Sequence, residues 1–454
     1  MAKKRTRYAC RQCGAVQPRW LGQCPECGEW NTLEEEAVTD RRSAGGARPA
    51  TASVPSDAVA SGDLVRTSTG MAELDRVLGG GCVAGSVILV GGEPGVGKST
   101  LMLQAAGRMA SAGLTVLYAS GEESVDQAAA RARRTQSVSA GLLLLAETSL
   151  EAMMDEVRAR SPAVIVLDSV QTVRSAEAEG SAGTVSQVRA VASALADHAK
   201  ATGTSVFLVG HVTKEGAIAG PKMLEHMVDV VLYFEGETTR HYRIVRNTKN
   251  RFGAAHEVGV FEMTGQGLVE VAEPSAVFLE KDRPAAPGVA IHAGAEGGRG
   301  LVLEIQALVT SPGYGTPRRS VTGLDPGRVS LILAVLDRKA GLHVLSEDVF
   351  VNAPGGLRIT EPAADLATAA AIASAATGVP GDREAAWTGE VGLTGEARWV
   401  GRMEVRIAEV RKLGLARLVV PSTNVAEAER LAGGTIEVLG ISDVSRLVGI
   451  VTGR

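Results

Sequence analysis

The middle of the chain alternates short apolar runs with longer segments of mixed, helix-compatible composition. The apolar runs are nearly continuous in Val, Ile and Leu, and they cover residues 87–92, 114–120, 141–146, 163–170 and 204–212. A strand in a parallel sheet is apolar on both sides because helices cover both faces of the sheet. The segments 100–112 and 186–201 have the length and composition of crossover helices. The pattern therefore predicts an α/β core with a mostly parallel sheet.

The pattern changes on both sides of this core. Residues 34–61 are rich in Glu, Ala, Gly, Ser, Arg and Pro without an apolar period, which is typical of a flexible linker. Residues 228–268 have the pattern of paired strands with polar turns. Beyond residue 271, strand-like runs such as 301–309 occur with an alanine-rich segment at 363–376 that is expected to be a helix.

At 454 residues the chain is too long for one hydrophobic core, so several domains are expected. They are a cysteine-rich module at 1–33, the linker at 34–61, the core domain at 62–270 and a second α/β domain at 271–454. No run approaches the roughly 18 apolar residues of a membrane span, and the N-terminus lacks a secretory signal, so a cytoplasmic protein without a membrane partner is expected. The net charge is only −4, so bulk charge gives no evidence for nucleic-acid binding.

Four of the five cysteines form two C-x2-C pairs near the start of the chain. They are Cys10 and Cys13, followed by Cys24 and Cys27. Two such pairs can present four thiolates in the tetrahedron that zinc prefers, and four sulfur ligands leave no position for a substrate. The spacing predicts a structural Zn2+ site, with free or redox-active thiols as the alternative.

A glycine-rich loop directly follows the first apolar run. It matches the phosphate-loop pattern G-x4-G-K-[ST], and the order strand, loop, helix disfavours the alternative of a glycine turn without a ligand. The backbone amides of such a loop surround phosphate, and the N-terminus of the next helix adds positive potential. Lys98 is expected to contact the β and γ phosphates of ATP, and Ser99 to bind Mg2+. The expected nucleotide-binding residues are Gly92, Glu93, Pro94, Gly95, Val96, Gly97, Lys98, Ser99 and Thr100.

Three polar residues after other apolar runs are expected at the same edge of the sheet. Asp168 ends one strand-like run and is expected to hold Mg2+ through water. Glu122 is the expected group that orients water against the γ phosphate, and the alternative is that Glu122 and Glu123 are two solvated acids. His211 ends another run and is either a γ-phosphate sensor or a hydrogen-bonded core histidine.

Residues 249–253 have the sequence Lys-Asn-Arg-Phe-Gly, which taken alone is usually a solvated basic turn. Together with the phosphate loop and the cysteine pairs, this motif resembles the RadA (Sms) family of bacterial DNA repair proteins, whose ATPases are of the RecA and DnaB type. The resemblance covers the full chain. It implies that Lys249 and Arg251 project into the nucleotide site of a neighbouring subunit, where positive charge stabilises phosphoryl transfer. It also places Glu122, not Glu123, at the water-activating position.

The resemblance implies a RecA-like P-loop ATPase core with a zinc-ribbon-like module before it and an α/β Lon-protease-like domain after it. Members of this family form hexameric rings that bind single-stranded and branched DNA and drive branch migration in cooperation with RecA. DNA-binding loops are expected at 171–185 and 213–225, after consecutive core strands. The expected DNA contacts are Lys214, Lys222 and Arg251. An ATP-switched adaptor that loads a recombinase is the alternative.

The last domain resembles the proteolytic domain of Lon over residues 271–454. Lon-type peptidases need a serine that a lysine activates. Ala363 stands in the serine position and Arg406 in the lysine position. Alanine has no nucleophilic atom and arginine stays protonated at neutral pH, so a scaffold is expected in place of a peptidase. The domain's weak candidates for DNA contact are Arg318, Arg319 and Arg328.

Overall fold

The computed structural model describes most of the chain. The described ranges are 6–10, 16–26, 28–37, 64–211, 222–236, 241–279, 284–313, 315–354 and 358–452. The chain divides into two compact units. The first unit contains Met1–Glu235, Val245–Ala255 and Met263–Glu270, and the second contains Gly236–Ile244, His256–Glu262 and Val271–Arg454.

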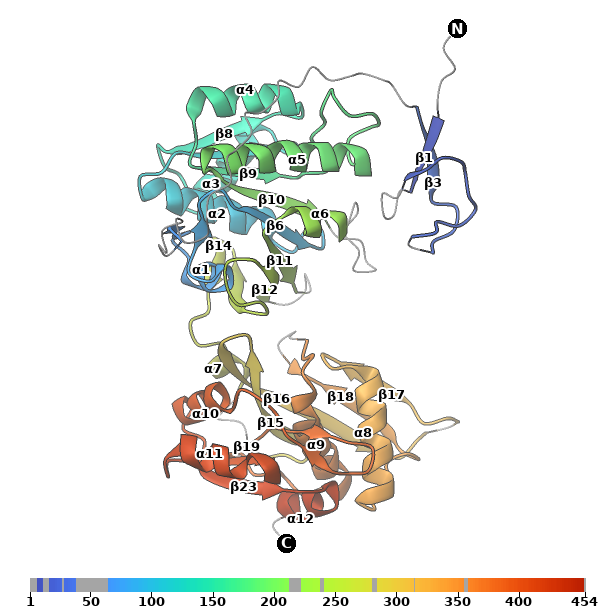
Figure 1. Ribbon diagram of the computed structural model, residues 1–454. Helices are drawn as coiled ribbons and strands as arrows, with labels where there is room; N and C mark the ends of the chain where they lie inside the picture. The colour runs from blue at the N-terminus through green and yellow to red at the C-terminus, as the bar shows by residue number, and fades with distance from the viewer. Residues whose placement is uncertain are drawn as a thin grey trace, which may run out of the picture. The chain divides into compact units, whose positions relative to one another are not determined.

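The N-terminal module contains a small antiparallel sheet (Figure 1). Its strands are β1 (Thr6–Cys10), β2 (Val16–Gln17) and β3 (Leu33–Ala37), in the order β2-β1-β3. Cys10 and Cys24 are both buried, and they share a small core with Leu33. Cys13 and Cys27 lie outside the described residues.

A nine-stranded sheet forms the centre of the ATPase region (Figure 1). Its strand order is β14-β13-β12-β11-β6-β10-β9-β7-β8. The strands are β6 (Val87–Gly92), β7 (Val116–Ser120), β8 (Leu142–Ala146), β9 (Val164–Asp168), β10 (Ser205–His211), β11 (Val230–Glu235), β12 (Tyr242–Asn250), β13 (Val258–Thr264) and β14 (Gly267–Glu270). Strands β6 to β11 pair in parallel, which confirms the α/β core. In the region expected to hold strand pairs, β11 instead joins β6 in parallel.

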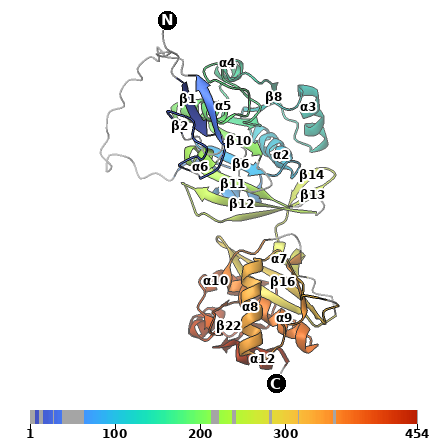
Figure 2. The same cartoon turned by 90° about the vertical axis from the view of Figure 1, so that its right-hand side faces the viewer.

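Helices cover both faces of this sheet (Figure 2). They are α1 (Ala72–Leu78), α2 (Lys98–Ser111), α3 (Val125–Arg134), α4 (Leu150–Arg160), α5 (Val185–Thr202) and α6 (Lys222–Met227), and the short strands β4 (Arg66–Thr67) and β5 (Cys82–Val83) pair beside them. Val87 and Leu89 of β6 share a buried cluster with Met153 of α4 and Val191 of α5. Side chains alternate along a strand, so the intervening Ile88 faces the other side of the sheet.

The second unit contains a seven-stranded sheet in the order β17-β18-β16-β15-β19-β22-β23. Its strands are β15 (Val289–Glu296), β16 (Arg299–Thr310), β17 (Arg319–Thr322), β18 (Asp348–Asn352), β19 (Ala385–Trp387), β22 (Arg417–Pro421) and β23 (Glu437–Ile441). β15 and β16 are antiparallel, whereas β19, β22 and β23 are parallel. The strands β20 (Glu390–Val391) and β21 (Ala397–Arg398) form a separate pair.

Helices also cover both faces of this second sheet. They are α7 (Pro274–Phe278), α8 (Pro326–Lys339), α9 (Asp365–Thr377), α10 (Met403–Lys412), α11 (Val425–Ala432) and α12 (Leu447–Thr452). Leu301 and Leu303 of β16 pack in one core with α8 and α9, whereas Val302 packs in another with α10 and α11. The alanine-rich helix expected at 363–376 begins later, because Pro362–Ala364 form a 3-10 turn. Among the described residues, no helix is long and apolar enough to cross a membrane.

Candidate active site

The carboxyl ends of four parallel strands bring the candidate catalytic residues to one edge of the ATPase sheet. Gly92 ends β6, Asp168 ends β9 and His211 ends β10. Glu122 lies two residues after the end of β7. Ligands of open α/β sheets bind at the carboxyl ends of the strands, so this edge is the expected place for a nucleotide.

The phosphate loop connects β6 to α2 and fits tightly against neighbouring strands. A Cβ atom at Gly97 would lie 2.7 Å from Cε of Met263, and the φ of Gly97 is 117°. A Cβ atom at Gly92 would lie 2.7 Å from the backbone oxygen of Phe234. Both positions therefore require glycine. The three residues that follow Gly92 are exposed, which leaves the loop backbone open to a phosphate.

The ammonium group of Lys98 is buried at the start of α2. Its Nζ donates to the backbone oxygens of Gly92 and Glu93, each at 2.8 Å, and lies 3.3 Å from Nδ1 of His211. Burial lowers the pKa of Lys98 to about 8, against the opposing effect of nearby carboxylates such as Asp168. A bound phosphate would supply the anionic partner that offsets this loss of hydration.

His211 connects Lys98 to Glu122. Lysine only donates, so the contact with Lys98 assigns the acceptor role to Nδ1 of His211 and leaves the hydrogen on Nε2. That Nε2 atom lies 3.1 Å from Oε1 of Glu122. The side chain of His211 therefore joins the phosphate lysine to the candidate water-orienting acid in one hydrogen-bonded series.

The two adjacent acids after β7 have different partners. Glu122 accepts hydrogen bonds from His211 and from Oγ of Ser169 at 2.6 Å. The hydrogen bond from His211 is the main cause that lowers the pKa of Glu122 to about 2, although partial burial opposes it. Glu123 instead forms an ion pair with Arg131 of α3. Of the two acids, Glu122 is the one that contacts His211, which in turn contacts Lys98 of the phosphate loop.

Asp168 offers one oxygen atom for a metal. Its Oδ2 accepts a hydrogen bond from the Tyr118 hydroxyl at 2.5 Å. Its Oδ1 is buried and has no hydrogen-bond partner among the described residues. An orphaned carboxylate oxygen beside the buried ammonium of Lys98 fits a hydrated Mg2+. Ser99 and Thr100 are half-buried in the first turn of α2, where a metal-binding hydroxyl is expected.

The Lys-Asn-Arg-Phe-Gly motif forms the end of β12 and the turn after it. Nζ of Lys249 donates to the backbone oxygens of Glu225 at 2.6 Å and Val228 at 2.8 Å, so within its own chain it caps the end of α6. Nη1 of Arg251 lies 3.1 Å from Oδ1 of Asp229, and the Arg251 side chain is 53% exposed. The two cations of the motif therefore have different environments.

The expected DNA-binding loops are described only in part. Residues 171–184 carry Arg174 with the acids Glu177 and Glu179, so their charge does not favour phosphate. Lys214 lies outside the described residues, and Lys222 begins α6. In the second unit, Arg318 and Arg319 are exposed. Arg328 differs from them because it pairs with Asp365.

The Lon-like nucleophile position holds a buried charge cluster in the second unit. Ala363 is buried, and two residues before it Glu361 accepts hydrogen bonds from Nη1 and Nη2 of Arg406. Nε2 of the fully buried His292 lies 2.8 Å from Oε1 of Glu361. Burial raises the pKa of Glu361, but His292 and Arg406 outweigh it and hold that pKa at about 2. The arginine is thus held as the partner of an acid, which agrees with the loss of the serine and lysine.

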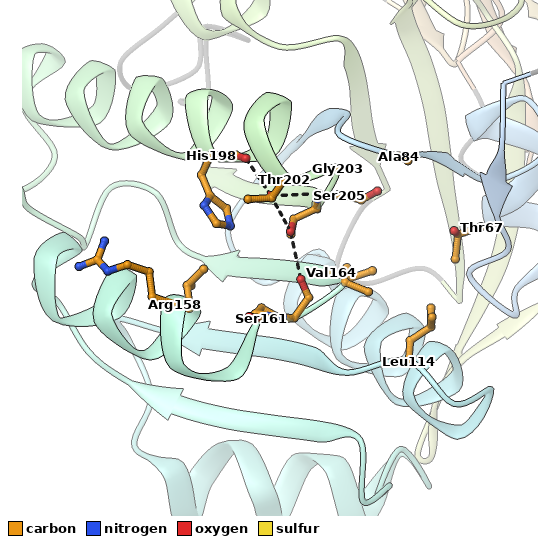
Figure 3. A pocket seen from close by; sticks show the side chains of 14 residues that line it. Thr67, Ala84, Leu114, Arg158, Ser161, Val164, His198, Thr202, Gly203 and Ser205 are labelled. Atoms are coloured by element: carbon orange, nitrogen blue, oxygen red, sulfur yellow. Dashed lines mark hydrogen bonds between the residues drawn. The ribbon is translucent and has the colours of Figure 1, made fainter. Parts of the chain in front are cut away.

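A separate cavity lies at the opposite edge of the ATPase sheet (Figure 3). Its volume is about 500 Å³, and it lies between the ends of α4 and α5 and the first residues of β9 and β10. Its polar side chains include those of Arg158, Ser161, His198 and Thr202. The residues of the phosphate loop do not line this cavity, so the nucleotide chemistry belongs to the other edge.

Known protein domains match three parts of the chain. The rubredoxin metal binding domain matches residues 8–35, an AAA domain matches residues 60–217, and the C-terminal proteolytic domain of Lon protease (S16) matches residues 337–452. With the phosphate loop at the carboxyl edge of a parallel sheet, these matches define a RecA-like P-loop ATPase with a zinc ribbon before it and a Lon-type domain after it.

Relatives extend over the whole chain. DNA repair protein RadA of Bacillus subtilis is 44% identical over 98% of each chain, and that of Halalkalibacterium halodurans is 44% identical over 100% of each. DNA repair protein RadA of Streptococcus pyogenes is 45% identical over 99% of this chain and 100% of its own. The chain belongs to the RadA family of DNA repair proteins. The solved KaiC-like protein PH0186 of Pyrococcus horikoshii is 18% identical, covers 46% of this chain and 99% of its own, and has a TM-score of 0.39.

Sequence reasoning missed the partners that orient these groups. Tyr118 and Ser169 bind the two acids of the nucleotide site, and Asp229 binds Arg251. His292 and Glu361 form the buried cluster with Arg406. The two residues of each pair are distant in sequence, so only the folded chain brings their atoms together.

Proposed function

We propose that the chain is a DNA-stimulated ATPase that translocates on single-stranded DNA as a helicase and promotes branch migration during homologous recombination and repair. The observation that carries the proposal is the hydrogen-bonded series Lys98, His211 and Glu122. His211 ends β10, and the segment expected to contact DNA follows it. A change at the γ phosphate is therefore expected to move the DNA-binding side of this strand. The DNA repair relatives support this activity and a cytoplasmic location.

In this proposal, each residue of the site has a separate task. Lys98 exchanges the carbonyls of its own loop for the β and γ phosphates. Asp168 would hold Mg2+ with its Oδ1 atom, through water, and Ser99 would hold it with its hydroxyl. When bound, Mg2+ neutralises charge that develops on the phosphate oxygens. Glu122 is a carboxylate at neutral pH and orients the attacking water as a hydrogen-bond acceptor.

The proposal includes a ring of subunits, in which a cation of the Lys-Asn-Arg-Phe-Gly motif reaches the nucleotide site of the neighbouring subunit. The half-exposed Arg251 is the better candidate for a finger that reaches the neighbouring nucleotide. Lys249 must first leave the two carbonyls that it caps. We propose a homo-hexamer that cooperates with RecA, in which the Lon-like domain is a scaffold without peptidase activity.

DNA and zinc contacts complete the proposal. Lys214 and Lys222 are the proposed contacts with DNA phosphates in the central channel. Arg318 and Arg319 are weaker candidates, because surface exposure is the only observation that favours them. Zinc is proposed to bind a complete set of four thiolates. These belong to Cys10, Cys13, Cys24 and Cys27.

A strand-displacement assay tests the motor directly. The purified chain is added with ATP to a synthetic three-stranded recombination intermediate that carries a fluorescent displaced strand. We expect directional branch movement that Arg251→Ala impairs without unfolding the chain. ATP hydrolysis without strand movement, together with faster RecA loading, would reject the motor in favour of a loading adaptor.

A further inference from the structure

Asp229 lies between the Lys-Asn-Arg-Phe-Gly turn and the strand that leads into the phosphate loop. It is buried immediately before β11. Its Oδ1 accepts a hydrogen bond from Nη1 of Arg251 at 3.1 Å, and its Oδ2 accepts one from the backbone N–H of Val87 at 3.0 Å. The two oxygens of one carboxylate therefore hold two separate parts of the chain.

Backbone hydrogen bonds reinforce both contacts. The N–H of Asp229 donates to the oxygen of Val87 at 2.9 Å, and the N–H of Arg251 donates to the oxygen of Asp229 at 3.1 Å. Arg251 is thus bound to Asp229 by its main chain and by its side chain. Asp229 is likewise bound to Val87, the first residue of β6, by its main chain and by its side chain.

This arrangement connects Arg251 to the strand that leads into the chain's own phosphate loop. Val87 begins β6, and β6 ends at Gly92, where the chain's own phosphate loop starts. Arg251 is the cation that the proposed function assigns to the site of the next subunit. The carboxylate of Asp229 holds the long side chain of Arg251 in one direction. Less conformational entropy is then lost when the guanidinium binds a phosphate.

We propose that Asp229 is a positioning residue that orients Arg251 toward the neighbouring nucleotide site and ties it to β6 of its own subunit. This inference rests on the proposed role of Arg251 between subunits. Lys249 does not share the task, because its ammonium group donates to the carbonyls at the end of α6. The alternative is a structural role in which Asp229 only keeps β11 beside β6.

The substitution Asp229→Asn tests the proposal with little change in shape. The amide retains one oxygen that can accept from Val87, but its NH2 group cannot accept from Arg251. We expect kcat for ATP hydrolysis to fall on the order of tenfold or more, which is part of the 10³ to 10⁵ that a finger arginine supplies. KM for ATP and the thermal unfolding temperature should stay close to those of the unsubstituted chain.

Mixed rings separate positioning from structure. An Asp229→Asn chain keeps its own Lys98, and in a mixture with Lys98→Ala chains it can receive an intact Arg251 from a neighbour. We expect the mixture to hydrolyse ATP faster than either variant alone. A structural defect in the site of the Asp229→Asn chain itself would not recover on mixing, and that result overturns the proposal.

The matching Arg251→Ala mixture distinguishes the proposal from its premise. If Arg251→Ala recovers with Lys98→Ala and Asp229→Asn does not, only the role of Asp229 is wrong. If Arg251→Ala fails to recover, the finger itself is wrong, and the role of Asp229 falls with it. The double variant Asp229→Asn with Arg251→Ala should lose no more than Arg251→Ala alone.

Asp155→Asn is the matched control. Asp155 pairs with Arg158 on the exposed surface of α4, so the change removes the same kind of carboxylate from the same kind of partner. Exposed pairs of this type contribute little. ATP hydrolysis by this control should equal that of the unsubstituted chain, and its mixture with Lys98→Ala should show no recovery beyond dilution.

Discussion

At the scale of single residues, the nucleotide site is defined by which oxygen atoms already have partners. Oε1 of Glu123 forms an ion pair with Arg131 of α3, whereas Oε1 of Glu122 contacts Nε2 of His211. In Asp168, the Tyr118 hydroxyl donates to Oδ2, and Oδ1 is buried without a hydrogen-bond partner among the described residues. The hydrogen bonds around each acid therefore decide its chemistry, because all three have similar carboxyl groups.

Tyr118→Phe tests the orientation of Asp168 by removing one oxygen atom. Without the hydroxyl the carboxylate loses the donor that fixes it, and outer-shell changes of this kind typically weaken metal affinity about 10- to 100-fold. We expect a fluorescent ATP analogue to bind more weakly than to the unsubstituted chain when Mg2+ is present. Its affinity in EDTA should be unchanged.

Tyr233→Phe is the control for this experiment, because its hydroxyl donates to Glu225 on α6, at 2.8 Å. This control should keep the ordinary dependence on Mg2+. Equal Mg2+ dependence of nucleotide binding in Tyr118→Phe and the unsubstituted chain would show that Tyr118 does not position Asp168.

At the scale of elements, a buried ion cluster joins the 3-10 turn, β15 and α10 of the Lon-like domain. Glu361 precedes the turn, His292 lies on β15 and Arg406 lies on α10. Nη1 of Arg406 also donates to the backbone oxygen of Ala293 at 2.7 Å. Glu361, His292 and Arg406 thus hold three elements together, and removing one partner leaves an uncompensated buried charge.

Acid should loosen this cluster. The folded pKa of Glu361, about 2, lies below its ordinary value of 4.5, so its ionised form stabilises the fold above about pH 4.5 and that contribution is lost as the pH falls toward 2. We expect amide hydrogen exchange in β15 and α10 to accelerate over this range. In Glu361→Gln, exchange should be faster at neutral pH and should lack this acid-dependent step. Parallel pH profiles for both chains would contradict the assignment.

Contiguous motifs made most of the ATPase predictable. The phosphate loop occupies one stretch of sequence, and its strand and helix follow the hydrophobic pattern, although α2 begins two residues earlier than the expected 100–112. The five apolar runs became parallel strands because burial on both faces leaves that pattern in the sequence. β11 has the same apolar character, but its parallel pairing with β6 depends on a connection that the pattern does not encode.

Contacts across the sheet were less accessible to sequence reasoning. Ser120 of β7 is the residue paired with Asp168 of β9, and Tyr118 lies two residues before Ser120. The long side chain of Tyr118 spans this offset, and its hydroxyl donates to Asp168. Asp229 precedes β11 and Arg251 follows β12, and the neighbouring positions of these two strands bring the side chains together. A choice between Glu122 and Glu123 likewise depends on Arg131, whose place is set by the start of α3 at Val125.

At the scale of the whole molecule, we propose a P-loop ATPase whose nucleotide site is completed between subunits. Lys98, Glu122 and Asp168 belong to the chain's own site, and Arg251 is offered to the next one. In the proposed function, the Lon-like domain is a scaffold for assembly without peptide hydrolysis. We propose that communication between sites passes through Asp229 and that DNA contacts the segments that follow the core strands.

The most direct test of this account measures ATP hydrolysis by the purified chain with and without single-stranded DNA, at low and moderate salt, beside Lys98→Ala. We expect strong stimulation by DNA that weakens at higher salt and is absent in Lys98→Ala, because the phosphate lysine is the principal cation of the site. Hydrolysis that persists in Lys98→Ala, or that is indifferent to DNA, would contradict a DNA-driven ATPase.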